Sequence, residues 1–131
     1  MVIYIVDNDW GSLHGLKRRI SKIIPDAEVR CFNRGAKALE AAKEQKCDVL
    51  FTEVDLINGT GYRIAKNFKE INPKINIIFT AVSEEYISYL LELHFSGYLL
   101  KPMTVEDIEF ELNDLRYPVE VSEPAVVYKY I

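Results

Sequence analysis

The 131-residue sequence has few of the residues that build secreted, metal-binding or membrane proteins. Cys31 and Cys47 are its only cysteines, and its two histidines, His14 and His94, lie far apart, which argues against a disulfide framework and a zinc site. No apolar run approaches the roughly 18 residues of a membrane-spanning helix, and no basic segment precedes the apolar N-terminus. We therefore predict a cytoplasmic protein that makes no membrane contact.

The sequence also has fewer basic than acidic residues. Sixteen Lys and Arg against twenty Asp and Glu give a formal charge of -4, unlike a domain held to DNA by phosphate contacts. Four basic residues fall within 17–22, opposite the apolar stripe of a predicted helix, so we interpret them as a solvated helix face. A hydrophobic content of 49% excludes a disordered chain, and the length fits one compact domain.

Short apolar runs alternate with amphipathic stretches along the chain. The predicted strands cover residues 2–6, 27–32, 48–53, 75–80 and 97–100, and the predicted helices cover residues 13–23, 36–45, 64–71, 84–95 and 105–115. Asn33 is the predicted N-cap of the second helix, and Thr104, with Asp107, that of the last. Five such units predict an α/β fold, a doubly wound five-stranded parallel sheet with helices on both faces.

Polar residues end several of these strands. In such sheets the ligand site lies beyond the carboxyl ends of the strands. The residues at these ends are Asp7, Asn8, Asp9, Glu53, Asp55, Thr80, Lys101 and Pro102. The acidic members suit a divalent cation such as Mg²⁺, whereas the hydroxyl and the ammonium suit the oxygens of a phosphoryl group.

Four motifs carry a resemblance to a known family. They are IVDND at 5–9, FTEVD at 51–55 with the segment through Gly61, IFTA at 78–81, and SGYLLKP at 96–102. In this order and spacing they resemble the CheY-like receiver domain of bacterial response regulators, of the kind joined to LytTR-like or related DNA-binding output domains. The resemblance covers residues 1–117 and implies a flavodoxin-like fold with strand order 2-1-3-4-5. Residues 118–131 are then a C-terminal extension or a linker toward an output domain.

The resemblance implies a role for each strand-end residue. In the family an aspartate after the third strand accepts a phosphoryl group beside a Mg²⁺ ion. Asp7 matches the first acid of the metal site, Asn8 takes the place of the second acid, Glu53 takes the place of the acceptor, and Asp55 would offer a backbone carbonyl. Thr80 matches the switch hydroxyl, Tyr98 the switch aromatic, and Lys101 the phosphate-contacting lysine, whose bond to Pro102 is typically cis.

Two departures from the family pattern change the expected chemistry. Glu53 is one methylene longer than aspartate, which misplaces its carboxylate for in-line attack. Asn8 removes a negative charge, so Mg²⁺ held by Asp7, Glu53 and Asp55 binds weakly if it binds at all, with Asp9 as a partial replacement. Glu53 instead sets a permanent charge near Thr80 and Lys101, which predicts a receiver that works without phosphorylation.

Apolar residues in the last third of the chain predict an interface. The fourth predicted helix is apolar around most of its circumference, and Phe110 lies opposite the buried stripe of the last helix. The resemblance places both helices beside the fifth strand, on the surface that receivers use to dimerise. We predict a homodimer through Tyr89, Leu93, Tyr98 and Phe110. The resemblance also implies a histidine kinase partner, and DNA contact only through an output domain.

Two alternatives stay open. A conventional Mg²⁺-dependent receiver would be phosphorylated at Glu53 or Asp55. A haloacid-dehalogenase-like phosphatase would use Asp7 as nucleophile and Asp9 as acid/base, since Asp7-Asn8-Asp9 resembles its Asp-x-Asp motif. The later Gly-Asp-x-x-x-Asp motif of that family is missing, so we expect no enzymatic turnover.

Overall fold

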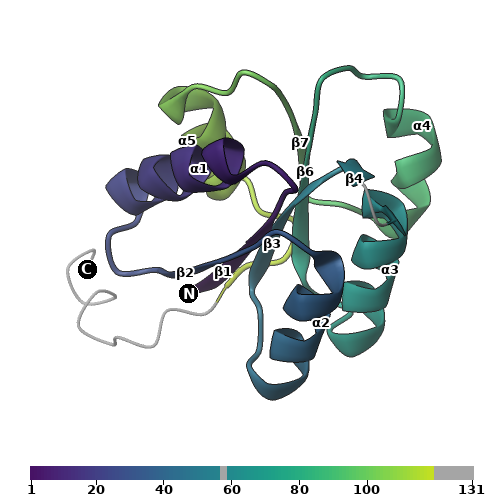
Figure 1. Cartoon of the computed structure of the whole chain (residues 1–131). Coiled ribbons are helices and arrows are strands. Elements are labelled where there is room, and N and C mark those ends of the chain that lie inside the picture. The colour runs from purple at the N-terminus through teal and green to yellow at the C-terminus, as the bar shows by residue number, and fades with distance from the viewer. Residues whose placement is uncertain (57–58, 120–131) are drawn as a thin grey trace.

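A computed structural model describes residues 1–56 and 59–119, and its centre is a five-stranded parallel sheet (Figure 1). The strands are β1 (Val2–Val6), β2 (Glu28–Phe32), β3 (Val49–Glu53), β6 (Asn76–Ala81) and β7 (Gly97–Leu100), in the spatial order β2-β1-β3-β6-β7. This is the predicted order 2-1-3-4-5, because the short strands β4 and β5 belong to a separate hairpin.

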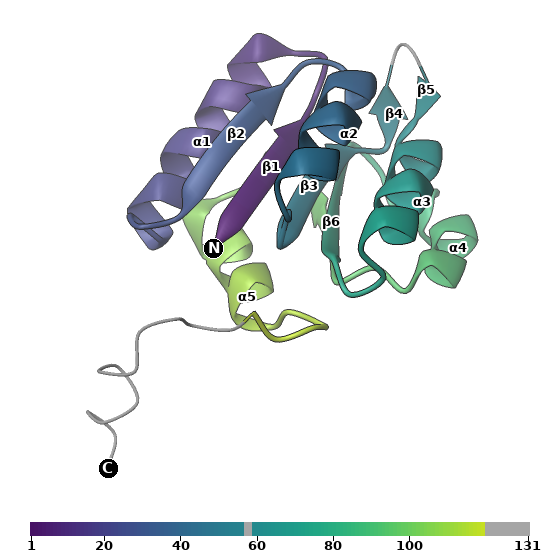
Figure 2. The ribbon, with the colours of Figure 1, turned by 90° about the horizontal axis from the view of Figure 1, so that it is seen from below.

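Helices cover both faces of this sheet, as predicted. They are α1 (Trp10–Ile23), α2 (Gly35–Glu44), α3 (Gly61–Ile71), α4 (Ile87–Leu90) with the following 3₁₀ turn η1 (Leu91–Leu93), and α5 (Val105–Asn113). Helices α1 and α5 lie on one face, and α2, α3 and α4 lie on the other (Figures 1 and 2). No helix in the described part of the chain is long and apolar enough to cross a membrane.

The central strands are buried on both faces, so their side chains form two cores. Tyr4 and Leu50 pack on the α2–α3 side, whereas Ile5 and Phe51 pack on the α1–α5 side. Alternate residues of a strand point to opposite faces, which is why a continuous apolar run such as 2–6 supplies both cores at once.

Helix starts follow side-chain capping at most positions. The predicted capping box of Thr104 and Asp107 is present at α5, and the Asp9 side chain accepts from the Ser12 amide at α1. The prediction for α2 is wrong, because its N-cap is Arg34, which makes no side-chain capping bond. The chain stays extended one residue further than predicted before it enters this helix.

The fourth predicted helix is much shorter than residues 84–95. Only Ile87–Leu90 is α-helical, and Leu91–Leu93 tightens into a 3₁₀ turn that ends at His94 with a φ of 51°. When apolar side chains surround a regular helix, they cannot all face the core of the protein. The tighter 3₁₀ turn buries both Leu90 and Leu93. The predicted exposure of Leu93 at an interface is therefore wrong.

A small hairpin that the sequence analysis did not predict follows β3. Its strands β4 (Asp55–Leu56) and β5 (Gly59–Thr60) are antiparallel and lead into α3. A Cβ atom on Gly61 would lie 2.4 Å from the carbonyl oxygen of Glu53, so only glycine permits this close approach. Residues 57–58 of the predicted turn, and the extension from residue 120 onward, lie outside the described residues.

Candidate functional site at the carboxyl edge of the sheet

Lys101 joins two carboxylates that come from different strands. Its ammonium lies 2.8 Å from Asp7 Oδ2 and also forms an ion pair with Glu53 Oε2. Asp7 follows β1, Glu53 ends β3 and Lys101 follows β7, so the parallel topology brings them together from three positions in the sequence. Asp7 and Glu53 are both buried, which makes this a largely desolvated cluster with one cation and two anions.

Thr80 is the fourth member of this cluster. It lies beside Glu53 in the register of β3 and β6, and its hydroxyl donates to Glu53 Oε2 at 3.3 Å. The same carboxylate oxygen thus meets both the hydroxyl and the ammonium that the sequence analysis assigned to a phosphoryl group.

Backbone hydrogen bonds fix the strand ends that carry these side chains. The Asp9 amide donates to Asp7 Oδ1 at 2.9 Å, and the Lys101 amide donates to the Ala81 carbonyl at 2.8 Å. The Lys101–Pro102 peptide bond is cis, as the resemblance predicts. Asp7 therefore has one oxygen on a backbone donor and the other on Lys101.

Burial and the ion pair have opposite effects on the pKa of Glu53 and on the pKa of Lys101. Burial raises the pKa of Glu53, and its bond to Lys101 offsets only part of that rise. Burial lowers the pKa of Lys101, but hydrogen bonds to Asp7 and Glu53 more than offset it, so the net pKa of Lys101 is raised. Lys101 is therefore firmly a cation that holds two carboxylates.

The remaining predicted site residues are directed elsewhere. Asn8 donates from its amide to the Asn33 carbonyl at 3.1 Å, Asp9 caps α1, and Asp55 is exposed in the hairpin. Within residues 1–56 and 59–119, no three His, Cys, Asp or Glu side chains gather in a way that could hold a metal ion. The residues do not fit Mg²⁺ in this arrangement, because the Lys101 ammonium already lies between the two buried carboxylates.

Tyr98 links β7 to the segment before α4. Its hydroxyl donates to the Ser83 carbonyl at 2.6 Å, and its amide donates to Glu111 Oε2 at 3.0 Å. Burial, with smaller effects from nearby acidic groups, raises the pKa of Tyr98 to about 12. The predicted switch aromatic is thus half-buried and neutral, and it contacts both α5 and the loop that follows β6.

Exposed apolar side chains lie on α4, on the η1 turn that follows it, on β7 and on α5. Tyr89 and Phe110 are exposed as predicted, Phe110 by 68% of its surface. Leu91 and Leu100 are also exposed, and the sequence analysis did not predict this. Leu91 was assigned to a regular helix and Leu100 to a buried strand, and neither pattern indicated that the side chain faces outward. We call Tyr89, Leu91, Leu100 and Phe110 the α4–β7–α5 face.

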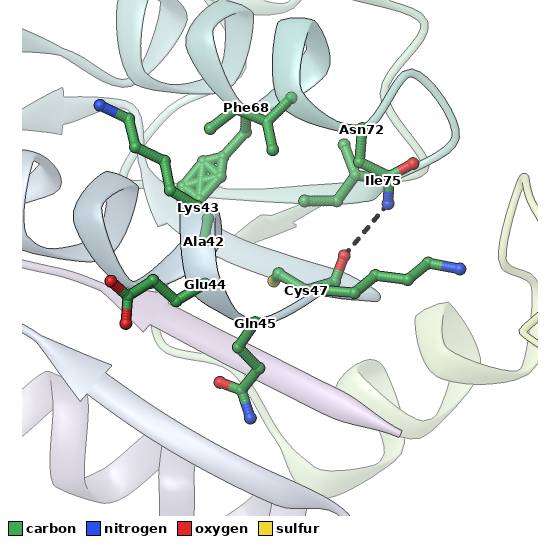
Figure 3. A pocket seen from close by; sticks show the side chains of 10 residues that line it. Ala42, Lys43, Glu44, Gln45, Cys47, Phe68, Asn72 and Ile75 are labelled. Carbon is green, nitrogen blue, oxygen red and sulfur yellow. Dashed lines mark hydrogen bonds between the residues drawn. The ribbon is translucent and has the colours of Figure 1, made fainter.

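A hollow lies at the end of the sheet opposite the cluster around Lys101 (Figure 3). It has a volume of about 330 Å³ and is lined by Ala42, Cys47, Phe68 and Ile75, among others. Asn72 donates to the Cys47 carbonyl at 3.3 Å across one wall. Cys47 precedes β3 and Ile75 precedes β6, so this hollow is not connected to the cluster around Lys101.

Comparisons with known proteins agree with this fold. A family model described as the response regulator receiver domain matches residues 3–113. The chain belongs to this family. It is 27% identical over 111 residues to the sensory transduction protein LytT of Bacillus subtilis, a match that covers 85% of this chain and 46% of that protein.

Two further relatives widen the comparison. The transcriptional regulatory protein LytR of Staphylococcus aureus is 24% identical over 116 residues, covering 88% of this chain and 47% of LytR. The receiver spans about half the length of these curated relatives. The response regulator TrrA of Thermotoga maritima, solved in complex with Mg²⁺ and BeF, has a TM-score of 0.76 at 17% identity and is covered to 96%, against 86% of this chain.

Proposed function

We propose that this receiver signals without phosphorylation, because the Glu53 carboxylate supplies the charge that a phosphoryl group brings to other receivers. One observation carries the proposal: Glu53 Oε2 contacts both Thr80 and Lys101. An aspartate at position 53 would be shorter by about 1.5 Å, one carbon–carbon bond, so its oxygen would fall short of one or both partners.

The substitution is an incomplete replacement for phosphate. A phosphoryl group carries a charge of about -1.5 to -2 and three acceptor oxygens, whereas a carboxylate carries -1 and two oxygens. Lys101 also shares its charge with Asp7. The proposed result is a domain that stays near its signalling arrangement, held there by weaker contacts than a phosphorylated receiver has.

The proposed output is association through the α4–β7–α5 face into a homodimer. Four of the eight large apolar side chains exposed in the described residues lie on α4, η1, β7 and α5, and exposed apolar surface of this kind supports a contact with another molecule. The family supports a histidine kinase as an upstream partner and a cytoplasmic location. LytR is a transcriptional regulatory protein, so transcriptional control through a DNA-binding region outside residues 1–119 is part of the proposal.

We propose no enzymatic turnover. A phosphatase of the haloacid-dehalogenase type would need Asp9 as a free acid/base, but both the Ser12 amide and the Ser12 hydroxyl donate to Asp9 Oδ2. The membership in the receiver family also favours a binding module over that enzyme. A conventional phosphoacceptor receiver stays as the second candidate, to be separated by experiment.

A titration with Mg²⁺ and beryllofluoride tests the proposal. Isothermal calorimetry of the wild-type chain is expected to give no saturable binding, and sedimentation equilibrium is expected to give the same dimer dissociation constant with and without these ions. Saturable binding together with tighter association would instead favour the conventional receiver.

A matched pair of variants tests the proposed interface. Phe110→Ala is expected to weaken self-association at least tenfold, because large apolar anchors dominate such contacts. Ile71→Ala removes an exposed apolar side chain from α3, outside the α4–β7–α5 face, and is expected to leave association unchanged. Equal effects of the two variants would contradict the proposed face.

A further inference from the structure

The chain segment that follows α5 lies against the base of the sheet, the edge opposite Glu53. Tyr117 reaches the first residue of β6, and the segment can be followed below α5 in Figure 2. Its contacts come from α3, from β6 and from the connection between η1 and β7. This arrangement was absent from the sequence analysis, which predicted no contact for residues 116–117 and treated residues 118–131 as an extension or a linker.

Asn76 makes the central contact of this segment. It is the first residue of β6 and is only 1% exposed. Its Nδ2 donates to the Tyr117 carbonyl at 2.7 Å, and its Oδ1 accepts from the Tyr117 amide at 2.8 Å. One side chain therefore satisfies both backbone polar groups of Tyr117, in the way that a neighbouring strand would.

Two further elements hold the same segment. From α3, the Lys69 ammonium lies 4.6 Å from the centre of the Tyr117 ring, within the range of a cation–π contact. From the connection between η1 and β7, Ser96 Oγ accepts from the Arg116 amide at 3.0 Å. The segment is thus bonded at consecutive residues rather than resting loosely on the surface.

A buried asparagine at this position needs a reason. Its neighbours Ile75 and Ile77 are fully buried, and an apolar residue would suit the start of a buried strand better, since an unpaired amide there is costly. Asn76 also donates to the Asp48 carbonyl, but only at 3.4 Å, so its two short bonds both go to Tyr117. The Asn76 side chain therefore bonds mainly to the segment after α5 and not to the neighbouring strand.

We infer that Asn76, Ser96 and Lys69 form a docking site for the exit segment Arg116–Pro118, which fixes where the polypeptide after α5 leaves the receiver. Asn76 and Thr80 lie four residues apart on β6, about 13 Å along one strand. The docking site is thereby tied to the strand that carries the Glu53 contact and, through Ser96, to the connection that follows α4. Its role in signalling rests on the proposed function, but the docking itself does not.

Limited trypsin digestion of the whole chain tests the docking site, because trypsin cleaves the Arg116–Tyr117 bond that these contacts protect. In Asn76→Ala, cleavage after Arg116 is expected to be at least tenfold faster relative to the other cleavage sites, followed by mass spectrometry. Ser96→Ala removes the hydrogen bond from the Arg116 amide to Ser96 Oγ and leaves the core unchanged. We expect it to accelerate the same cleavage two- to threefold.

Two controls separate docking from general stability. Asn72→Ala removes another asparagine at the base of the sheet, whose amide bonds to Cys47 and not to the exit segment. Val49→Ala weakens the core beside Asn76, its partner in the strand register, without removing a contact of Tyr117. Both are expected to leave cleavage after Arg116 within twofold of the wild type.

Cleavage after Arg116 that is unchanged in both Asn76→Ala and Ser96→Ala would overturn the docking site. Equal acceleration by Val49→Ala at the same loss of stability would overturn it as well. The readout does not involve Mg²⁺, beryllofluoride or a phosphoryl donor. A failure here is therefore distinguishable from a failure of the proposed phosphorylation-independent signalling.

Discussion

The two ends of the parallel sheet bury polar groups in different ways. At the carboxyl edge, Asp7, Glu53 and Lys101 are charged and neutralise one another in part. At the base, the buried polar side chains of Asn76 and Cys47 are uncharged. The comparison shows how one sheet can separate a buried charged site from a docking surface whose buried contact is neutral, with strand β6 reaching both.

The difference has an energetic meaning. A buried ion pair depends on each partner, because removing one leaves an uncompensated charge. A neutral side-chain amide that bonds to the backbone leaves no charge behind when it is removed. Its removal costs only the free energy of the hydrogen bonds that it makes. Perturbations at the carboxyl edge should therefore be large and dependent on pH, whereas those at the base should be local.

The largest expected effect concerns thiol reactivity at the base. Burial raises the pKa of the Cys47 thiol to about 12, well above its usual value. At pH 8 the folded protein should hold on the order of a thousandfold less Cys47 thiolate than the unfolded chain. Alkylation by iodoacetamide, followed by peptide mass spectrometry, measures this, with the same reaction in urea as the control. Equal rates in the folded and unfolded states would show that the base is open to water.

Removal of the cation at the carboxyl edge should cost the most stability. In Lys101→Met the two carboxylates of Asp7 and Glu53 lose their shared partner, and we expect a loss of about 2 kcal/mol in the free energy of unfolding at pH 8, allowing for partial exposure. Urea titration measures it. Lys43→Met, an exposed lysine near the base, is the matched control and should change stability by less than about 0.5 kcal/mol.

The loss in Lys101→Met should also depend on pH. Without the cation, burial and repulsion by Asp7 hold the pKa of Glu53 above its unfolded value. A raised pKa favours the folded state below the unfolded pKa, and that stability is lost as the pH rises through the folded value. The variant should therefore lose less stability at pH 5 than at pH 8, and a loss independent of pH would contradict a charge-based edge.

A smaller effect is expected from the hydroxyl of Thr80. Thr80→Val keeps the shape of the side chain but removes its bond to Glu53, which should cost about 1 kcal/mol in unfolding free energy. Thr52→Val is the matched variant, because the Thr52 hydroxyl is buried in the same sheet and donates to the Glu53 backbone carbonyl rather than to its carboxylate. A more stable Thr80→Val protein would show that this hydroxyl is not held by Glu53.

Sequence patterns predicted the sheet well, because continuous apolar runs such as 2–6 have few alternatives to a strand buried on both faces. They failed at residues 84–95, where apolar residues on every side leave the direction of burial undetermined until the neighbouring elements are in place. The buried Leu93 is a direct result of this ambiguity.

The candidate site could be predicted in part. The positions of Asp7, Glu53, Thr80 and Lys101 at strand ends required only the topology, and these four side chains do meet. The directions of Asn8, Asp9 and Asp55 depend on caps and turns that the strand pattern does not fix. The contact of Asn76 with Tyr117 spans 41 residues, and its only signal was a polar residue inside an apolar run.

The most direct test of the central claim is the intact mass of the protein after incubation with acetyl phosphate and Mg²⁺. The account predicts no adduct on the wild-type chain and a single phosphoryl adduct on Glu53→Asp, in which the shorter carboxylate regains the acceptor geometry. A stable adduct on the wild-type chain that maps to Glu53 or Asp55 would contradict it.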